Sequence, residues 1–168
     1  MSGSYDSSAL IWDSNKRSII DTLDLNTKRS NNQLPMSSPP FVLSIATTVD
    51  GRHLAVGSAN GSIWLSFAKN DKHNKKFSNL SSAIEVSQSH NGPVVSLSFN
   101  SKYLVSCSLH QLKLWFIEDL AKDIFNPIET INVNELEKTN AVLATDTSIF
   151  IGGFSSTGKG RLVVKSLM

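Results

Sequence analysis

Residues 89–99 read Ser-His-Asn-Gly-Pro-Val-Val-Ser-Leu-Ser-Phe, and residues 107–116 read Cys-Ser-Leu-His-Gln-Leu-Lys-Leu-Trp-Phe. Toward the end of each stretch apolar residues alternate with polar ones, which is the two-residue period of a half-buried β-strand. Turn-forming residues flank the first strand, Asn91-Gly92-Pro93 before it and Asn100-Ser101 after it. The two stretches therefore predict strands joined by tight turns.

The same alternation recurs along the rest of the chain in short bursts. Turn sequences such as Val49-Asp50-Gly51 and Ala59-Asn60-Gly61 separate the bursts, so the chain is expected to form one hairpin after another. One segment differs, because Leu120 and Ile124 follow Phe116 at helical spacing before Asn126-Pro127. We expect an all-β fold with one short helix near residues 118–125.

An internal repeat is present, with a spacing near fifty residues. Residues 3–13 align with residues 57–67 without a gap, and residues 107–116 fit if one residue is deleted. Trp12 and Trp115 fall on the same repeat position. Repeats of this length are typically single supersecondary units that bury their apolar faces by stacking on their neighbours.

With His90 upstream and Trp115 at its end, this repeat resembles the WD-repeat family, whose repeat opens with Gly-His and closes with Trp-Asp. The first copy matches the same pattern through Asp6 and Trp12-Asp13. The family folds as β-propeller blades of four antiparallel strands. The resemblance therefore implies a partial β-propeller of about three and a half blades.

The resemblance also implies a hydrogen-bond network of His, Ser, Asp and Trp inside a blade. In the third copy His90, Ser106 or Ser108, and Trp115 would form it, but His110 stands at the position of the Asp. His90 would then lack the acceptor that orients its ring. We expect these residues to have structural roles, with both tryptophans in the blade core: Asp6, Trp12, Asp13, His90, Ser106, Ser108 and Trp115.

The whole chain, residues 1–168, is expected to be one propeller fragment. Its parts are expected to be the end of a blade (1–26), a linker loop (27–40), two blades (41–89 and 90–133) and a degenerate last blade (139–168). The strand pattern gives two, four, four and three strands for the blade pieces. A closed ring of seven blades needs roughly 290 residues. The chain is therefore expected to be the C-terminal part of a larger propeller, and whether Met1 is the true start stays open.

Composition excludes several classes of protein. The 168 residues are 40% hydrophobic, enough for a sizeable core, and the formal net charge is only +2, so nucleic acid is not an expected partner. No apolar run approaches the ~18–20 residues of a membrane helix, and no signal peptide is evident. The single cysteine, Cys107, cannot form an intrachain disulfide. We expect a cytoplasmic or nuclear protein that binds no membrane.

Two apparent chemical motifs have simpler interpretations. Residues 153–160 match a phosphate-binding loop except that Gly160 replaces the Ser or Thr. Such a loop must open a helix, whereas the residues that follow have the pattern of a strand, so we expect a hairpin turn. The four histidines and Cys107 lack the fixed spacing of a zinc site. We expect no enzyme, no metal, no cofactor and no small-molecule substrate.

The resemblance implies a non-catalytic scaffold for protein–protein interaction. Two alternatives stay open: a substrate receptor docked on the adaptor of a cullin-type ubiquitin ligase, and a fragment without independent function. The ligase docking signature, Trp-Asp-x-Arg, would begin at Trp12, but Asn15 stands where the Arg should be. For Trp64 the sequence leaves two alternatives equally open, a position in the core and a position on the surface. Residues expected to contact a partner are Tyr5, Lys16, Arg17, Trp64 and His110.

Overall fold

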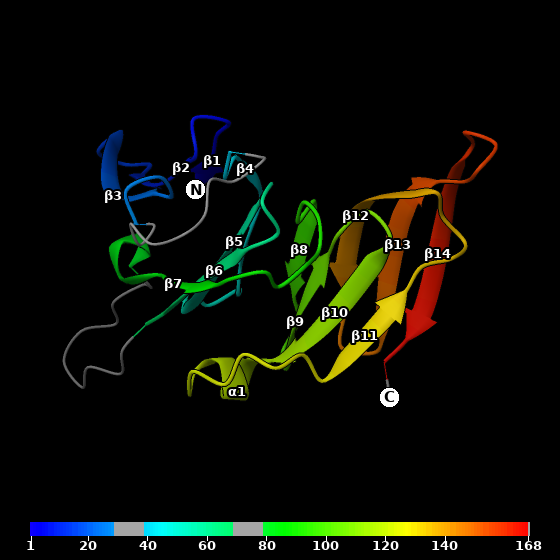
Figure 1. Cartoon of the computed structure of the whole chain (residues 1–168). Helices are drawn as coiled ribbons and strands as arrows, with labels where there is room; N and C mark the ends of the chain where they lie inside the picture. Colours follow the sequence, from blue (N-terminus) through cyan, green and yellow to red (C-terminus); the bar gives the residue numbers. More distant parts are fainter. Residues whose placement is uncertain (29–38, 69–78, 168) are drawn as a thin grey trace.

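The computed structural model describes residues 1–28, 39–68 and 79–167. In these segments fourteen strands form four antiparallel sheets that stand side by side in an arc (Figure 1). Most of the expected linker, residues 27–40, lies outside the described residues. Within them, no helix has the length and apolar composition that crossing a membrane requires.

Each sheet is a meander whose strands pair in chain order. The first sheet holds β1 (Ser2–Gly3), β2 (Ser8–Asp13) and β3 (Ser18–Asp24). The second holds β4 (Val42–Thr47), β5 (His53–Ser58), β6 (Ile63–Phe67) and β7 (Ile84–Val86), with a 3-10 turn at Leu80–Ser82. The third holds β8 (Ser96–Phe99), β9 (Tyr103–Cys107), β10 (Gln111–Phe116) and β11 (Glu129–Asn132), and the fourth holds β12 (Lys138–Ala144), β13 (Ser148–Phe154) and β14 (Gly160–Ser166).

The alternating apolar residues hold the arc together. One face of each sheet packs on the next sheet, and the first strands touch in series: β1 contacts β4, β4 contacts β8, and β8 contacts β12. Three apolar clusters fill the interfaces, centred on Leu23 and Trp64, on Leu65 and Trp115, and on Leu112 with the fourth sheet. Burial of these side chains is the main force that stacks the sheets.

The internal repeat is visible in the strand register. Gly3 pairs with Ala9 across the first hairpin, and Gly57 pairs with Ile63 across the second, at the positions that the gapless alignment equates. In the third sheet the equivalent pair is Cys107 and Leu112, so that turn is one residue shorter. The repeat found in the sequence is therefore a repeat of the same hairpin in space.

Two elements differ from the expectation. The helix α1 spans only Ile117–Leu120 and is followed by a turn in which Asp123 has a φ of 60°, a left-handed conformation that ends the helix before residue 125. The first sheet has three strands where two were expected, because β1 consists of two residues. Two residues are too few to show a period.

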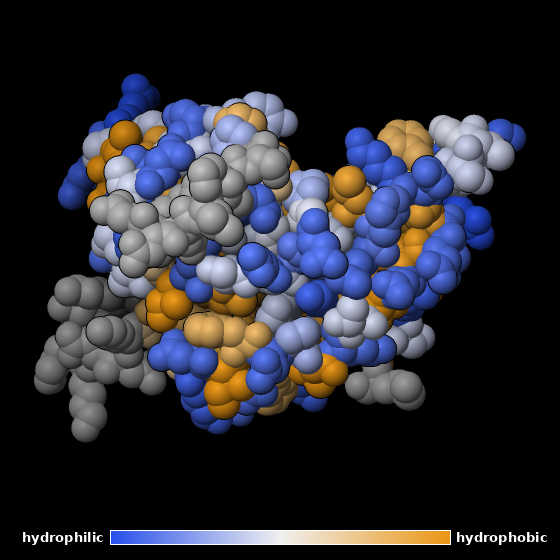
Figure 2. All heavy atoms as spheres, in the orientation of Figure 1, coloured by the Kyte–Doolittle hydropathy of each residue, from blue (hydrophilic) through white to orange (hydrophobic). Residues whose placement is uncertain are grey.

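The two ends of the arc expose apolar side chains. The fourth sheet exposes Leu143, Leu162 and Val164, and the first sheet exposes Ile19 and Ile20. Figure 2 shows hydrophobic residues over both ends of the arc, near β3 and near β13 and β14. These sheet faces resemble the internal ones in composition but lack a neighbouring sheet within the described chain.

Candidate functional site

His90, Ser106 and Trp115 meet in the interior of the third sheet. His90 Nε2 lies 2.7 Å from Ser106 Oγ, and Trp115 Nε1 donates a hydrogen bond of 2.8 Å to the same oxygen. All three side chains are buried. The structure therefore brings together three of the residues that the repeat pattern placed in one network.

The fourth member of that network has no counterpart. His90 Nδ1 is buried and has no hydrogen-bond partner among the described residues, and His110 lies exposed in the shortened turn. Burial lowers the pKa of His90 to about 4, and the nearby Lys113 ammonium lowers it further in the same direction. Lys113 Nζ is held by the carbonyl of Ser89 at 2.6 Å. His90 is therefore neutral at pH 7 and acts as a structural residue.

The first sheet repeats the Trp–Ser contact. Trp12 Nε1 donates to Ser2 Oγ at 2.9 Å, and Ser2 faces β2 in the register that Ser106 has with β10. Trp12 is nevertheless 46% exposed, whereas Trp115 is 2% exposed. A side chain at this repeat position faces the preceding sheet, and no sheet precedes the first one in the described chain. Trp12 was expected in the core, but it lies at the surface.

The remaining structural candidates stabilise turns. Asp6 Oδ1 accepts hydrogen bonds from the amide and hydroxyl of Ser8, which lower the pKa of that carboxyl. Asp13 Oδ1 accepts from the amides of the next turn. Ser108 Oγ donates to the carbonyl of Gln111 and does not join His90. Ser106 is thus the serine of the network.

The residues expected at a partner surface do not form one cluster. Tyr5 is exposed beside the ring of Phe41 in the β1–β2 turn, and Lys16 and Arg17 are exposed in the β2–β3 turn at the opposite end of the strands. Trp64 is only 3% exposed and packs between the first and second sheets. An apolar face of the first sheet covers it, so this tryptophan is a core residue.

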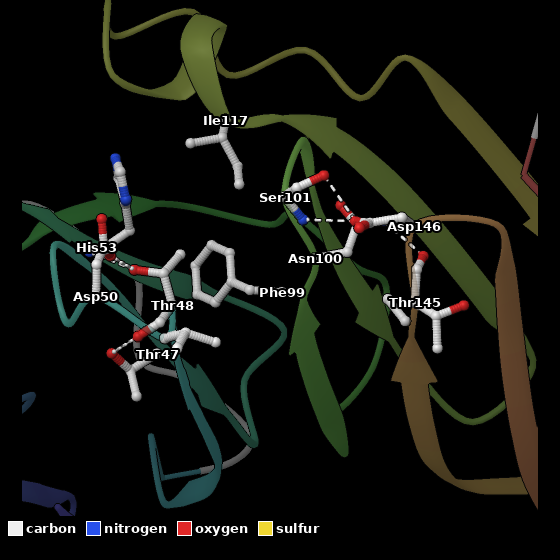
Figure 3. Close-up of a pocket in the computed structure, with 12 residues that line it drawn as sticks. Thr47, Thr48, Asp50, His53, Phe99, Asn100, Ser101, Ile117, Thr145 and Asp146 are labelled. Atoms are coloured by element: carbon white, nitrogen blue, oxygen red, sulfur yellow. Dashed lines mark hydrogen bonds between the residues drawn. The ribbon is translucent and has the colours of Figure 1, made fainter.

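The hollow that sequence reasoning missed lies among three turns of successive sheets. A cavity of about 650 Å³ is lined by residues of the β4–β5, β8–β9 and β12–β13 turns and by Ile117 of α1. Figure 3 shows Thr48 and Asp50 on one side, Ser101 and Asp146 on the other, and Phe99 between them. The turns lie about fifty residues apart in the sequence, and turn signals at Asp50-Gly51 and Asn100-Ser101 marked only two of them.

Short hydrogen bonds brace these turns. Thr48 Oγ1 donates to Asp50 Oδ1 at 2.6 Å, and Ser101 Oγ donates to Asp146 Oδ1 at 2.6 Å. These hydroxyl donors are the main reason that the pKa of each carboxyl is lowered. Burial lowers the pKa of His53, which also lines the cavity. At pH 7 the cavity therefore carries two carboxylates and a neutral imidazole.

The segment that resembled a phosphate-binding loop joins β13 to β14 as a hairpin turn. Ser155 and Lys159 close the turn with a backbone hydrogen bond of 2.9 Å, and Gly158 supplies the left-handed conformation at φ 75°. No helix follows, because β14 begins at Gly160. Among the side chains that the structure describes, no three His, Cys, Asp or Glu residues gather to hold a metal ion.

Comparison with known proteins fixes the fold. Residues 82–115 match the family described as WD40, WD domain, G-beta repeat. The crystal structure of the RRP9 WD40 repeats superposes with a TM-score of 0.69 at 18% identity, and the structure of U3-55K with a TM-score of 0.67 at 18% identity. No curated protein matches the chain in sequence. The chain has the fold of a partial β-propeller, and residues 82–115 match a WD40 repeat.

Each of these two superpositions covers 98% of this chain but 46% of the solved structure, so the chain spans about half the length of those propellers. The four sheets are its blades, and the matched repeat at 82–115 contains the His90, Ser106 and Trp115 network. The cavity lies where the first and second strands of three consecutive blades are joined.

Proposed function

We propose that this WD40-repeat chain is a non-catalytic scaffold for protein–protein interaction and works as part of a larger propeller. Stacked sheets form a stiff support, and the turns at their ends present side chains to other proteins. The observation that carries the proposal is the cavity framed by the turns of three consecutive blades. No cofactor is needed for this role.

The bracing of the turns supports a platform that does not rearrange on binding. Thr48 ties its own turn twice, through its backbone amide to the carbonyl of His53 and through its hydroxyl to Asp50. Asn100 Nδ2 donates to the carbonyl of Thr145 and connects two blades. A preorganised surface loses little conformational freedom when a partner binds.

The exposed blade faces at both ends of the arc support the proposal that the chain is part of a larger propeller. Inside the arc each such face is buried against its neighbour. Leu162, at 64% exposure, and Val164, at 53%, lie on one end face. Exposed apolar patches of this kind typically mark contact surfaces, and further blades would bury them as the internal blades do.

The proposal is tested by capture through a tag at the C-terminus, at the native locus, with quantitative mass spectrometry of the proteins that elute. A scaffold is expected to bring down at least one other protein at a constant stoichiometry. The tag alone is the control. Elution of the chain without a stoichiometric protein would contradict the proposal and favour a fragment without independent function.

A narrower proposal is a substrate receptor of a cullin-type ubiquitin ligase. Residues 38–168 resemble the C-terminal half of WD repeat-containing protein 53 in the run Ser38-Pro39-Pro40, the turn Asp50-Gly51-Arg52 and the pair Leu114-Trp115. After Trp12-Asp13 the signature Arg is replaced by Asn15, and two exposed cations, Lys16 and Arg17, follow it.

This narrower proposal predicts direct binding of the purified ligase adaptor. Reversing the charge of both cations, Lys16→Glu with Arg17→Glu, is expected to weaken that binding without unfolding the chain, because both side chains are exposed. Absence of adaptor binding by the wild-type chain would overturn the receptor role and leave the scaffold role untouched. We also propose a cytoplasmic or nuclear location, in keeping with a lone, buried Cys107.

A further inference from the structure

The turns that join the first and second strands of neighbouring blades differ in how they contact one another. Between the third and fourth sheets, the Ser101 amide donates to Asp146 Oδ1 at 3.1 Å and the Ser101 hydroxyl at 2.6 Å. Asn100 Nδ2 donates to the Thr145 carbonyl at 2.9 Å. These bonds join the two turns directly, so little space is left for a ligand there.

The equivalent gap between the second and third sheets is open. Thr48, Asn100 and Thr145 share the first turn position, because the backbone amide of each donates across its own turn, to His53, Tyr103 and Ser148 respectively. Val49 therefore occupies the position of Ser101. Its side chain has no donor or acceptor, and no hydrogen bond joins Thr48 or Val49 to Asn100 or Ser101 in the described chain.

Val49 gives the cavity an apolar rim. Val49 is fully exposed beside the hollow. Phe99, Ile117 and Ala144 supply apolar surface in the lining. Burial of Val49 by a partner would remove apolar surface from water, which is favourable.

The charges in the cavity select the partner. Asp50 stands on one side and Asp146 on the other (Figure 3). Their lowered pKa values keep both ionised at pH 7, and His53 adds no positive charge there. The cations next to them along the chain, Arg52 and Lys102, do not line the cavity, although the positive charge of each helps to lower the pKa of the neighbouring carboxyl. A carboxylate accepts several hydrogen bonds at once, so each can bind a cation and its turn together.

We infer that this cavity binds an extended segment of a partner protein. An apolar side chain of that segment lies against Phe99 and Ile117, covered by Val49, and a Lys or Arg side chain of the same segment contacts the Asp146 carboxylate. The inference rests on the scaffold function proposed above and specifies the chemistry of the partner.

The test begins with a phage-displayed library of random dodecapeptides, selected on the purified chain. Enriched peptides are synthesised with a fluorescent label and their affinity is measured by anisotropy. We expect the enriched sequences to share an aliphatic or aromatic residue and, within a few positions, a Lys or Arg. Raising the salt concentration should weaken their binding.

Three variants locate the binding. Val49→Lys should weaken it at least tenfold and leave the fold intact, since Val49 is fully exposed. Asp146→Asn keeps an oxygen for Ser101 but removes the charge, and it should also weaken binding severalfold. Leu162→Lys, at an exposed apolar position outside the cavity, is the matched control and should bind as the wild type does.

Two results would overturn the inference. One is selection that yields no consensus or a consensus without a cation, and the other is peptides that bind Val49→Lys as well as they bind the wild type. Capture of a stoichiometric protein by the tagged Val49→Lys chain would show that the scaffold function holds while the cavity is not its site. If the tagged wild-type chain captures no stoichiometric protein, the proposed scaffold function is itself contradicted.

Discussion

His90 has one ring nitrogen bonded to Ser106 and the other buried without a partner. An unpaired buried polar atom costs free energy, because water satisfies it in the unfolded chain. The resemblance to the WD repeat implies an Asp in this turn that would accept from Nδ1, and the third repeat has a shorter turn with His110 at that position. The resemblance therefore predicts this defect.

The first prediction concerns pH. The pKa of His90 is about 4 in the folded chain and near 6.5 when unfolded. Below pH 6.5 the unfolded chain binds more protons, so stability falls as the pH falls, by about 3 kcal/mol near pH 4. Urea unfolding between pH 7.5 and 4.5 measures this, and the loss should be much smaller in His90→Gln.

The carboxylates contribute only at the acid end of that measurement. The lowered pKa values of Asp6, Asp50, Asp146 and Glu135 contribute stability that is lost as the pH falls through their ordinary values of 3.8 and 4.5, so the loss between pH 7.5 and about 5.5 comes from the histidines. His53, whose pKa is also lowered, contributes in the same direction as His90. An unchanged pH dependence in His90→Gln would show that His90 is not the buried neutral group.

The second prediction compares two tryptophans that make the same hydrogen bond in different surroundings. Trp115→Phe removes the bond to Ser106 in the core and should cost about 1–3 kcal/mol. Trp12→Phe removes the bond to Ser2 at an exposed position and should cost less than about 1 kcal/mol. Urea unfolding measures both, and equal costs would contradict the burial that distinguishes them.

The strands and hairpins could be predicted from the sequence, but the sheet that packs on each of their faces could not. A two-residue period shows which side chains share a face, and the repeat shows which turns are equivalent. Neither shows which sheet covers a face. This is why Trp64 was expected at the surface as readily as in the core, and why Trp12 was expected in the core.

The candidate cavity was beyond prediction for a similar reason. Thr48, Asn100 and Asp146 lie on three turns about fifty residues apart, and each turn alone has no chemical signature. Their proximity depends on the curvature of the arc. The glycine-rich turn at 153–160 was predicted correctly, because the strand pattern after it excluded a helix.

The third prediction concerns two turn glycines with left-handed φ. Gly61→Ala brings its Cβ to within 2.2 Å of the His90 carbonyl, whereas Gly158→Ala has open space around its Cβ. The strained φ alone costs about 1–2 kcal/mol in both. Gly61→Ala should therefore lower the free energy of unfolding by at least about 1 kcal/mol more than Gly158→Ala. Equal losses of unfolding free energy in the two variants would contradict the close packing of the β5–β6 turn against the His90 carbonyl.

On the scale of the whole molecule, the arc has apolar sheet faces at both ends. The fourth prediction is that the purified chain self-associates through them, as seen by light scattering. Leu162→Lys with Val164→Lys places two charges on one end face and should reduce the association. Val49→Lys, which removes an exposed apolar residue away from that face, should leave it unchanged. Association that persists in the double variant would exclude this end face.

We propose that the arc works as part of a larger propeller that binds other proteins. Native mass spectrometry of the assembly captured through a C-terminal tag measures its composition. We expect one species of fixed stoichiometry, heavier than the 18.3 kDa chain and its tag, in which the propeller has further blades and a bound protein. A stable, monodisperse species with the mass of the single tagged chain would contradict it.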